Sequence, residues 1–264
     1  MTAKKVIMGQ DTVNRCQSAQ MSDVGCVREL NEDAISSAPD FWIVADGMGG
    51  HACGEVASDL AVKDIASVFA QSQSLTKAIQ SAHHRIIAAV HEGLGQSGMG
   101  TTVVAASSDN EKYKIAWVGD SRAYLWDATK SQLIQVSEDH SLMVRLINAG
   151  LLTVDDAKTH PQRHMITQCL GSTEIEDVEV GVYECEWEAN QQLILCSDGL
   201  SDELDDNAIT EIMNNKKSIE EKTQRLVNAA KQAGGRDNVS VIIISSPIIK
   251  RLSFIERVRA LFGG

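Results

Sequence analysis

Three apolar runs of this chain each end at an aspartate with a glycine beside it. The runs read FWIVADG, KIAWVGD and QLILCSDG, and their aspartates are Asp46, Asp120 and Asp198. Runs of this length and composition are typical of buried strands. One such aspartate alone is explained by a turn, because Asp and Gly are common turn residues. Three strands with the same ending indicate a shared site.

The order of the segments limits the fold class. Strands and helices do not alternate regularly, which favours an antiparallel α+β fold over a doubly wound parallel sheet. Residues 140–170 contain a short helix followed by a polar stretch, so we expect an excursion from the sheet there, called the flap below. The expected strands lie at 41–45, 101–107, 112–118, 191–197 and 238–245, and the expected helices at 52–70 and 74–92.

Two more aspartates stand at the opposite ends of their segments. Asp33 and Asp237 precede strand-like runs. In an antiparallel sheet the start of one strand lies beside the end of its neighbour. All five aspartates can therefore meet at one edge.

Such a cluster requires positive charge. Without cations, five carboxylates would repel one another and raise their own pKa values. Oxygen ligands with no His–Cys grouping suit Mg²⁺ or Mn²⁺ and suit zinc poorly. Several carboxylates around small turns leave room for two ions and water, an arrangement used to hydrolyse phosphate esters.

Composition excludes several other classes. The length of 264 residues and the 43% hydrophobic content favour one domain with a substantial core. A net charge of −12 disfavours nucleic acid as a partner. The N-terminal stretch lacks a continuous apolar run, so we expect a soluble, cytoplasmic protein. The six cysteines are scattered without a CxxC pair, and we expect reduced thiols.

Six segments, in order and spacing, resemble the motifs of the metal-dependent protein phosphatase family (PPM, or type 2C), in a bacterial single-domain form. They read SDVGCVRELNEDA, VADGMGGHACGEVAS, GTTVV, VGDSRAYL, CSDGLSDEL and GGRDNVSVIII, within residues 16–246. The resemblance implies two antiparallel sheets in a central sandwich flanked by helices, with metals in the channel between them. It implies a catalytic domain over residues 1–246, including the flap.

The resemblance also implies roles for individual residues. Asp46 would bridge two Mn²⁺ or Mg²⁺ ions, and a water between the ions would attack phosphorus without a phosphoenzyme. Arg28 would hold the phosphate through its planar fork. The other implied ligands are Asp198 and Asp237 at the first ion, the Gly47 carbonyl at the second, Glu32 and Asp33 orienting its waters, and Asp120, Asp198 and Asp202 at a third ion.

Two positions depart from the family pattern. Met48 stands where animal-type members have a histidine that protonates the leaving group, and His51 lies further along the turn, where we expect it to begin a helix. The leaving-group acid is therefore unassigned. Gln168 stands where bacterial relatives often carry arginine, which predicts altered substrate contacts near the flap.

These features predict a phosphatase for phosphoserine and phosphothreonine proteins, the substrates of an opposing Ser/Thr kinase. One alternative is a phosphatase dedicated to a single regulatory protein. Another, of a different class, is a catalytically idle, metal-stabilised binding module. Turnover of a small aryl phosphate that depends on metal separates the enzymes from the binding module.

Residues 247–264 continue past the last motif as a basic, amphipathic tail. Apolar residues follow approximate helical spacing, and four Lys or Arg residues make this the most basic part of the chain. A helix packed on its own domain, or a frayed tail, is one interpretation. The other is docking on an acidic partner or an anionic membrane surface.

Overall fold

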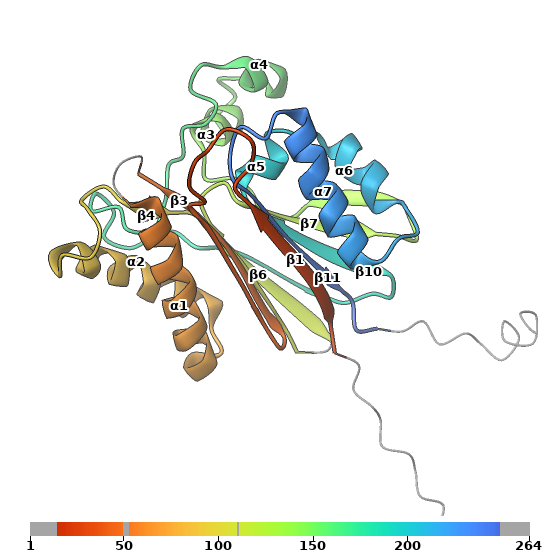
Figure 1. Ribbon diagram of the computed structural model, residues 1–264, viewed down its shortest axis with the longest axis horizontal. Coiled ribbons are helices and arrows are strands. Elements are labelled where there is room, and N and C mark those ends of the chain that lie inside the picture. The colour runs from red at the N-terminus through yellow and green to blue at the C-terminus, as the bar shows by residue number, and fades with distance from the viewer. Residues whose placement is uncertain (1–14, 50–52, 110, 249–264) are drawn as a thin grey trace, which may run out of the picture.

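Two antiparallel sheets form the centre of the protein, and helices cover their outer faces (Figure 1). The structure, a computed structural model, describes residues 15–49, 53–109 and 111–248. The five-stranded sheet has the order β1 (Gln17–Asp23), β11 (Val239–Ser245), β10 (Gln191–Cys196), β7 (Arg122–Asp127) and β8 (Gln132–Gln135). The six-stranded sheet has the order β2 (Asp33–Ala38), β3 (Phe41–Met48), β5 (Val103–Ser108), β6 (Lys112–Val118) and β9 (Gly181–Glu186), with β4 (Gly100–Thr101) paired to β3.

The helices fall into three groups along the chain. The long helices α1 (Gly54–Ser72) and α2 (Leu75–His91) cover the six-stranded sheet. The five-stranded sheet is covered by α5 (Asp198–Ser201), α6 (Asp206–Met213) and α7 (Ile219–Ala233). The flap contains α3 (Leu142–Asn148) and α4 (Val154–Thr159), which lie at the top of Figure 1.

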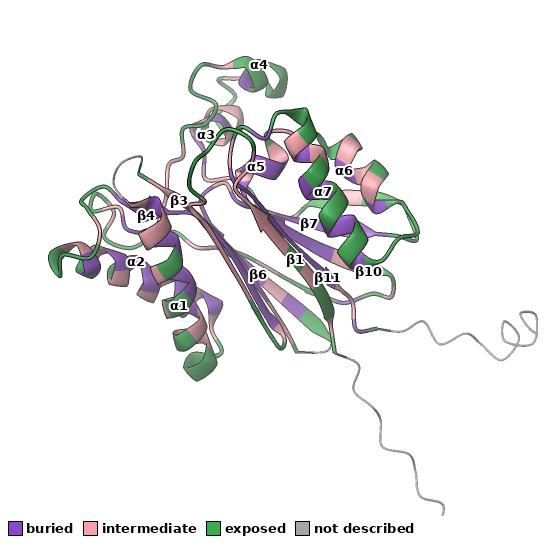
Figure 2. Ribbon diagram, in the orientation of Figure 1, coloured by how far each residue is buried: buried purple, intermediate pink, exposed green. Residues whose placement is uncertain are grey.

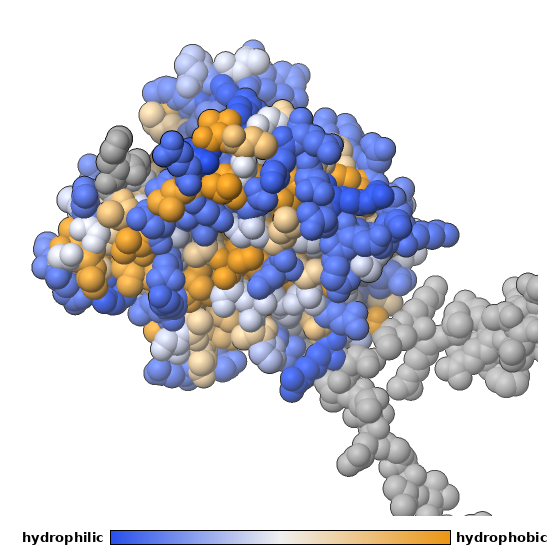
Figure 3. Space-filling view, in the orientation of Figure 1, coloured by the Kyte–Doolittle hydropathy of each residue, from blue (hydrophilic) through white to orange (hydrophobic). Residues whose placement is uncertain are grey.

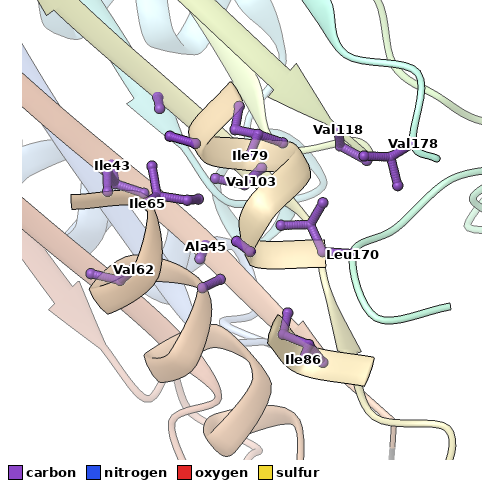
Figure 4. Packing of buried hydrophobic residues seen from close by; sticks show 14 of the residues in the cluster. Ile43, Ala45, Val62, Ile65, Ile79, Ile86, Val103, Val118, Leu170 and Val178 are labelled. Atoms are coloured by element: carbon purple, nitrogen blue, oxygen red, sulfur yellow. The ribbon is translucent and has the colours of Figure 1, made fainter. Parts of the chain in front are cut away.

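The alternation of side chains along each strand builds three apolar layers. In β3, Ile43 faces α1 and α2, whereas Trp42 and Val44 face the other sheet. Figure 4 shows Ile43 packed beside Ile65 of α1 within the helix-side layer. Successive residues of the central strands are buried (Figure 2), and the apolar clusters place their side chains on both faces of each sheet. The sheets are therefore covered on both sides, which holds their edges in fixed positions.

The expected α+β architecture with two antiparallel sheets and flanking helices is confirmed. The expected strand at 101–107 is interrupted at Thr102, whose N–H binds the Asp46 carbonyl instead of continuing a ladder. The flap has two short helices where the sequence indicated one. All six cysteines are free thiols. Within the described ranges, no helix has the length and apolar character needed to cross a membrane. The tail from residue 249 onward lies outside them.

Candidate metal centre

Asp33 and Asp46 occupy facing positions at one end of the six-stranded sheet. They are partners in the antiparallel register of β2 and β3. The backbone at Asp46 is fixed by two donors to its carbonyl, the Thr102 N–H at 2.9 Å and the Thr101 hydroxyl at 2.8 Å. The ends of β2 and β3 therefore bring two carboxylates to one edge, as the sequence predicted for this pair.

The five-stranded sheet contributes carboxylates to the same edge. Asp198 begins α5 directly after β10, and Asp237 stands just before the neighbouring strand β11. Gly199 lets these two segments approach, because a Cβ there would lie 2.0 Å from the Asn238 carbonyl oxygen. A residue with a side chain would push α5 away from the start of β11.

Electrostatics shows that the buried carboxylates act on one another. Burial raises the pKa of Asp46 well above its usual range, and the nearby charges of Asp198, Asp33 and Asp120 raise it further. The pKa of Asp198 is also raised well above its usual range, first by burial and then by the charges of Asp120, Asp202 and Asp237. Burial raises the pKa of Asp33 to about 6, against the hydrogen bonds of neighbouring serines. The acids from both sheets therefore form one electrostatic cluster.

The donor set fits hard divalent cations. The Asp33 Oδ2 atom accepts a hydrogen bond from the Ser197 hydroxyl at 2.8 Å, whereas its Oδ1 atom is buried with no hydrogen-bond partner. A buried carboxylate oxygen without a donor is costly unless a cation meets it. Across residues 15–49, 53–109 and 111–248, no three His, Cys, Asp or Glu side chains are already arranged to hold one ion. The backbone positions that bring these carboxylates together are set by the two sheets.

Glu32 and Gly47 lie next to each other beside this cluster. The Gly47 N–H donates to the Glu32 carbonyl at 3.1 Å. A Cβ on Gly47 would lie 2.2 Å from the Gly54 carbonyl oxygen, so only glycine fits between β3 and the start of α1. Burial raises the pKa of Glu32, and the charge of Arg28 opposes this effect.

Arg28 contacts the cluster from its exposed side. Its Nη2 atom donates to the Asp237 Oδ2 atom at 2.7 Å, and its Nη1 atom lies 4.0 Å from Glu32 Oε2. About half of the Arg28 side chain (48%) is exposed. The guanidinium is therefore positioned between the acid cluster and solvent.

Asp120 and Asp202 extend the cluster toward the flap. Burial, then the charge of Asp139, raises the pKa of Asp120 to about 6. Burial also raises the pKa of Asp202, opposed first by His164. The His164 Nδ1 atom of the flap lies 3.0 Å from Asp202 Oδ2. Asp202, for which the family resemblance implies a role at a third ion, thus contacts the flap.

Two residues with clear roles in the structure were missed in the sequence. Asn238, which follows Asp237, is buried and binds three backbone groups of the β1–β2 loop. His164 binds Asp202 across the flap. An Asn directly after a conspicuous aspartate was a usable signal for the first, whereas nothing local in the sequence indicated the second.

The two departures from the motif pattern have different outcomes. Met48 lies at the end of β3, while His51 falls outside the described residues. The hydrogen bonds of the Gln168 side chain go to Glu179 and not to the acid cluster. Its amide N–H donates to Glu179 Oε2 at 3.2 Å, and its amide oxygen accepts from the Glu179 backbone N–H at 2.8 Å. Gln168 therefore ties the end of the flap to the segment that precedes β9.

Comparison with known proteins agrees with this fold. The model of the family "Protein phosphatase 2C" matches residues 27–240. The serine/threonine phosphatase stp of Listeria monocytogenes is 33% identical over 246 residues, which cover 87% of this chain and 96% of that protein. The crystal structure of the Mycobacterium tuberculosis serine/threonine phosphatase PstP/Ppp superposes with a TM-score of 0.80 at 34% identity, over 88% of this chain and 98% of that one. A structure of the PstP catalytic domain in complex with two manganese ions superposes with a TM-score of 0.77 at 32% identity, with the same coverage. This chain therefore belongs to the protein phosphatase 2C family.

Proposed function

We propose that the chain, a protein serine/threonine phosphatase by its family, hydrolyses phosphoserine and phosphothreonine with Mn²⁺ or Mg²⁺ held by the acid cluster. The observation that carries this proposal is that Asp46 and Asp198 come from different sheets, are both buried, and lie close enough to affect each other's pKa. No phosphoenzyme is needed, because water can attack phosphorus directly. When bound, two divalent ions lower the pKa of a water molecule and neutralise charge on the phosphate.

The protein's own residues position these components. Asp46 would bridge the two ions, since it lies at the centre of the cluster and feels the charges of three other aspartates. Asp198 and Asp237 would complete the first ion's ligands. The Gly47 carbonyl would bind the second ion, and the acids Glu32 and Asp33 would orient its waters.

Arg28 would hold the phosphate. Its guanidinium is half-exposed and already within hydrogen-bond distance of the cluster at Asp237. A planar fork of donors matches two phosphate oxygens at once. Arg28 would therefore fix the phosphorus atom relative to the acids without taking part in bond making.

A third ion would be held by Asp120, Asp198 and Asp202. Mutual charge effects support this assignment, because Asp120 and Asp202 each raise the pKa of Asp198. The substrates would be cytoplasmic phosphoproteins of an opposing Ser/Thr kinase. The relatives named above are serine/threonine phosphatases, which supports this class of substrate.

Phosphate release from a phosphothreonine peptide, measured during a Mn²⁺ titration, tests the proposal. We expect activity to appear with Mn²⁺, to disappear with chelator, and to fall by orders of magnitude in Asp198→Asn. Asp177→Asn is a matched control, because the Asp177 side chain is 70% exposed and contacts only His84 among charged groups of the described chain. Equal activity of Asp198→Asn and Asp177→Asn would refute the proposed metal centre.

A further inference from the structure

The loop between β1 and β2, residues 24–32, is clamped at both ends by one buried side chain. The Asn238 amide donates to the Val24 carbonyl at 3.0 Å and to the Leu30 carbonyl at 2.9 Å. The amide oxygen accepts from the Glu32 N–H at 2.8 Å. The Asn238 side chain is nearly inaccessible (4% exposed), and its three hydrogen bonds all join it to the backbone of this loop. The loop is therefore a fixed part of the domain.

A second set of contacts fixes the turn within the loop. The Cys26 N–H donates to the Gly235 carbonyl at 2.7 Å. Gly25 adopts a φ of +82°, and a Cβ there would lie 2.2 Å from the Asp237 carbonyl oxygen. The loop backbone thus packs directly on the segment that leads into β11.

This fixed loop directs two apolar side chains into solvent. Val27 is 66% exposed and Leu30 is 54% exposed. Figure 3 shows apolar surface over the loop that joins β1 and β2. Because Asn238 and Gly235 hold the loop backbone at several points, both apolar side chains remain exposed in the arrangement that the structure shows.

The position of these residues distinguishes them from other exposed apolar residues. Single apolar residues on a surface are ordinary, and Val182 and Leu94 are examples with similar exposure. Val27 and Leu30, however, flank Arg28, whose guanidinium binds Asp237 of the candidate metal centre. Val27 and Leu30 lie within two residues of Arg28 in the same held loop, so a phosphopeptide whose phosphate reached Arg28 would have these two side chains nearby.

We propose that Val27 and Leu30 form a subsite for an apolar side chain of the substrate, roughly one or two residues from the phosphoserine or phosphothreonine. This inference rests on the proposed role of Arg28 in phosphate binding. The occupant is a phosphorylated segment of a protein substrate. Its phosphate complements Arg28 and its apolar neighbour removes Val27 and Leu30 from water.

A selectivity ratio measures the subsite directly. Pairs of phosphothreonine peptides that differ only by Leu or Ser, at each of the two positions on either side of phosphothreonine, are compared by kcat/KM with Mn²⁺ present. At one or more of these positions we expect the wild-type protein to favour Leu by about tenfold, and the double variant Val27→Ser/Leu30→Ser to reduce the ratio to about one or two. The ratio cancels any loss common to both peptides. Val182→Ser/Leu94→Ser is the matched control, with the same substitutions at 45% and 48% exposed positions, and should keep the wild-type ratio.

The outcomes separate this inference from the proposed function. Failure of the wild-type protein to hydrolyse either peptide of a pair would contradict the proposed function itself. Hydrolysis with a ratio near one at all four positions would overturn the subsite alone. An unchanged ratio in the double variant would also overturn the subsite. If the wild-type protein sediments as an associated species and this double variant as a monomer, the surface would instead be assigned to contact between copies of the chain.

Discussion

Asp33 and Asp46 face each other across β2 and β3, and both carboxyls are buried beside acids of the other sheet. The charge of Asp33 contributes to the raised pKa of Asp46. Two buried carboxyls, where the charge of one raises the pKa of the other, are not readily ionised together without a cation nearby. The facing pair therefore couples the stability of the fold to both pH and metal.

The first prediction concerns that coupling in protein treated with chelator. The pKa values of Asp33 and Asp120 are raised to about 6 in the folded protein, so the folded state binds protons more tightly than the unfolded chain. Their stabilising contribution is complete below an unfolded pKa of about 4 and is lost as pH rises through about 6, by about 3 kcal/mol for each carboxyl. Melting temperatures measured from pH 4 to 8 should fall over this range. With Mn²⁺ present the fall should be absent or reversed, and an equal fall with and without Mn²⁺ would contradict the coupling.

The second prediction separates charge from structure in the cluster. Asp46→Asn should reduce phosphatase activity by orders of magnitude, because the central ligand loses its charge. The same change removes repulsion from Asp198 and Asp33, so the variant without metal should melt at the same or a higher temperature. Thermal shift with and without Mn²⁺ measures both effects. Full stabilisation of the variant by Mn²⁺ would show that Asp46 is not the central ligand, and a lower melting temperature without metal would contradict the relief of repulsion.

The sequence predicted the parts of the fold whose signal is local. The apolar runs of β3, β6, β10 and β11 and the amphipathic helices α1 and α2 are continuous segments, and each forms close to its expected range. β8 and β9 are edge strands with exposed, mixed side chains, so their sequences resemble loops. α7 buries only a narrow apolar face, and the rest of its surface is polar or charged. Its sequence was therefore not distinguished from a loop.

The candidate site divides in the same way. The aspartates could be found because each stands at the end of an apolar run, and antiparallel pairing then brings Asp33 and Asp46 together. The contacts of Asn238 with the β1–β2 loop join residues more than 200 positions apart. The contact of His164 with Asp202 depends on how the flap lies on α5. Such contacts are set by tertiary packing and have no local pattern in a single sequence.

The third prediction tests positioning by Arg28. Arg28→Ala should raise KM for a phosphopeptide more than it lowers kcat, because the guanidinium would hold the phosphate in both the ground and transition states. Arg28→Lys should recover only part of the loss, since one ammonium group cannot bind two phosphate oxygens as a planar fork. Steady-state kinetics at saturating Mn²⁺ measures the effect. An unchanged KM in Arg28→Ala would remove this residue from the phosphate site.

The fourth prediction concerns Gln168 and the flap. Gln168→Ala removes two hydrogen bonds to residue Glu179 and should loosen the end of the flap. We expect a several-fold loss on phosphopeptides and a smaller loss on a small aryl phosphate, because loops beside a rigid site tune recognition. Gln162→Ala, at an exposed position of the same flap, serves as the control. Equal losses on both substrates would mean that the flap supports the metal centre instead of the protein substrate.

The last prediction concerns the buried clamp. Asn238→Ala leaves the Val24 and Leu30 carbonyls and the Glu32 N–H without their partner, and should destabilise the protein by about 2–4 kcal/mol. Because Arg28 lies within the released loop, KM for phosphopeptides should rise even at temperatures where the variant is folded. Asn238→Asp keeps the shape and the acceptor for Glu32 but loses both amide donors, so it should also free the loop while preserving more of the packing. Urea unfolding gives the stability change, and hydrogen exchange of residues 24–32 reports the loop. Unchanged exchange there in both variants, with KM unaltered, would show that the loop is held by its contacts with Gly235 and not by Asn238.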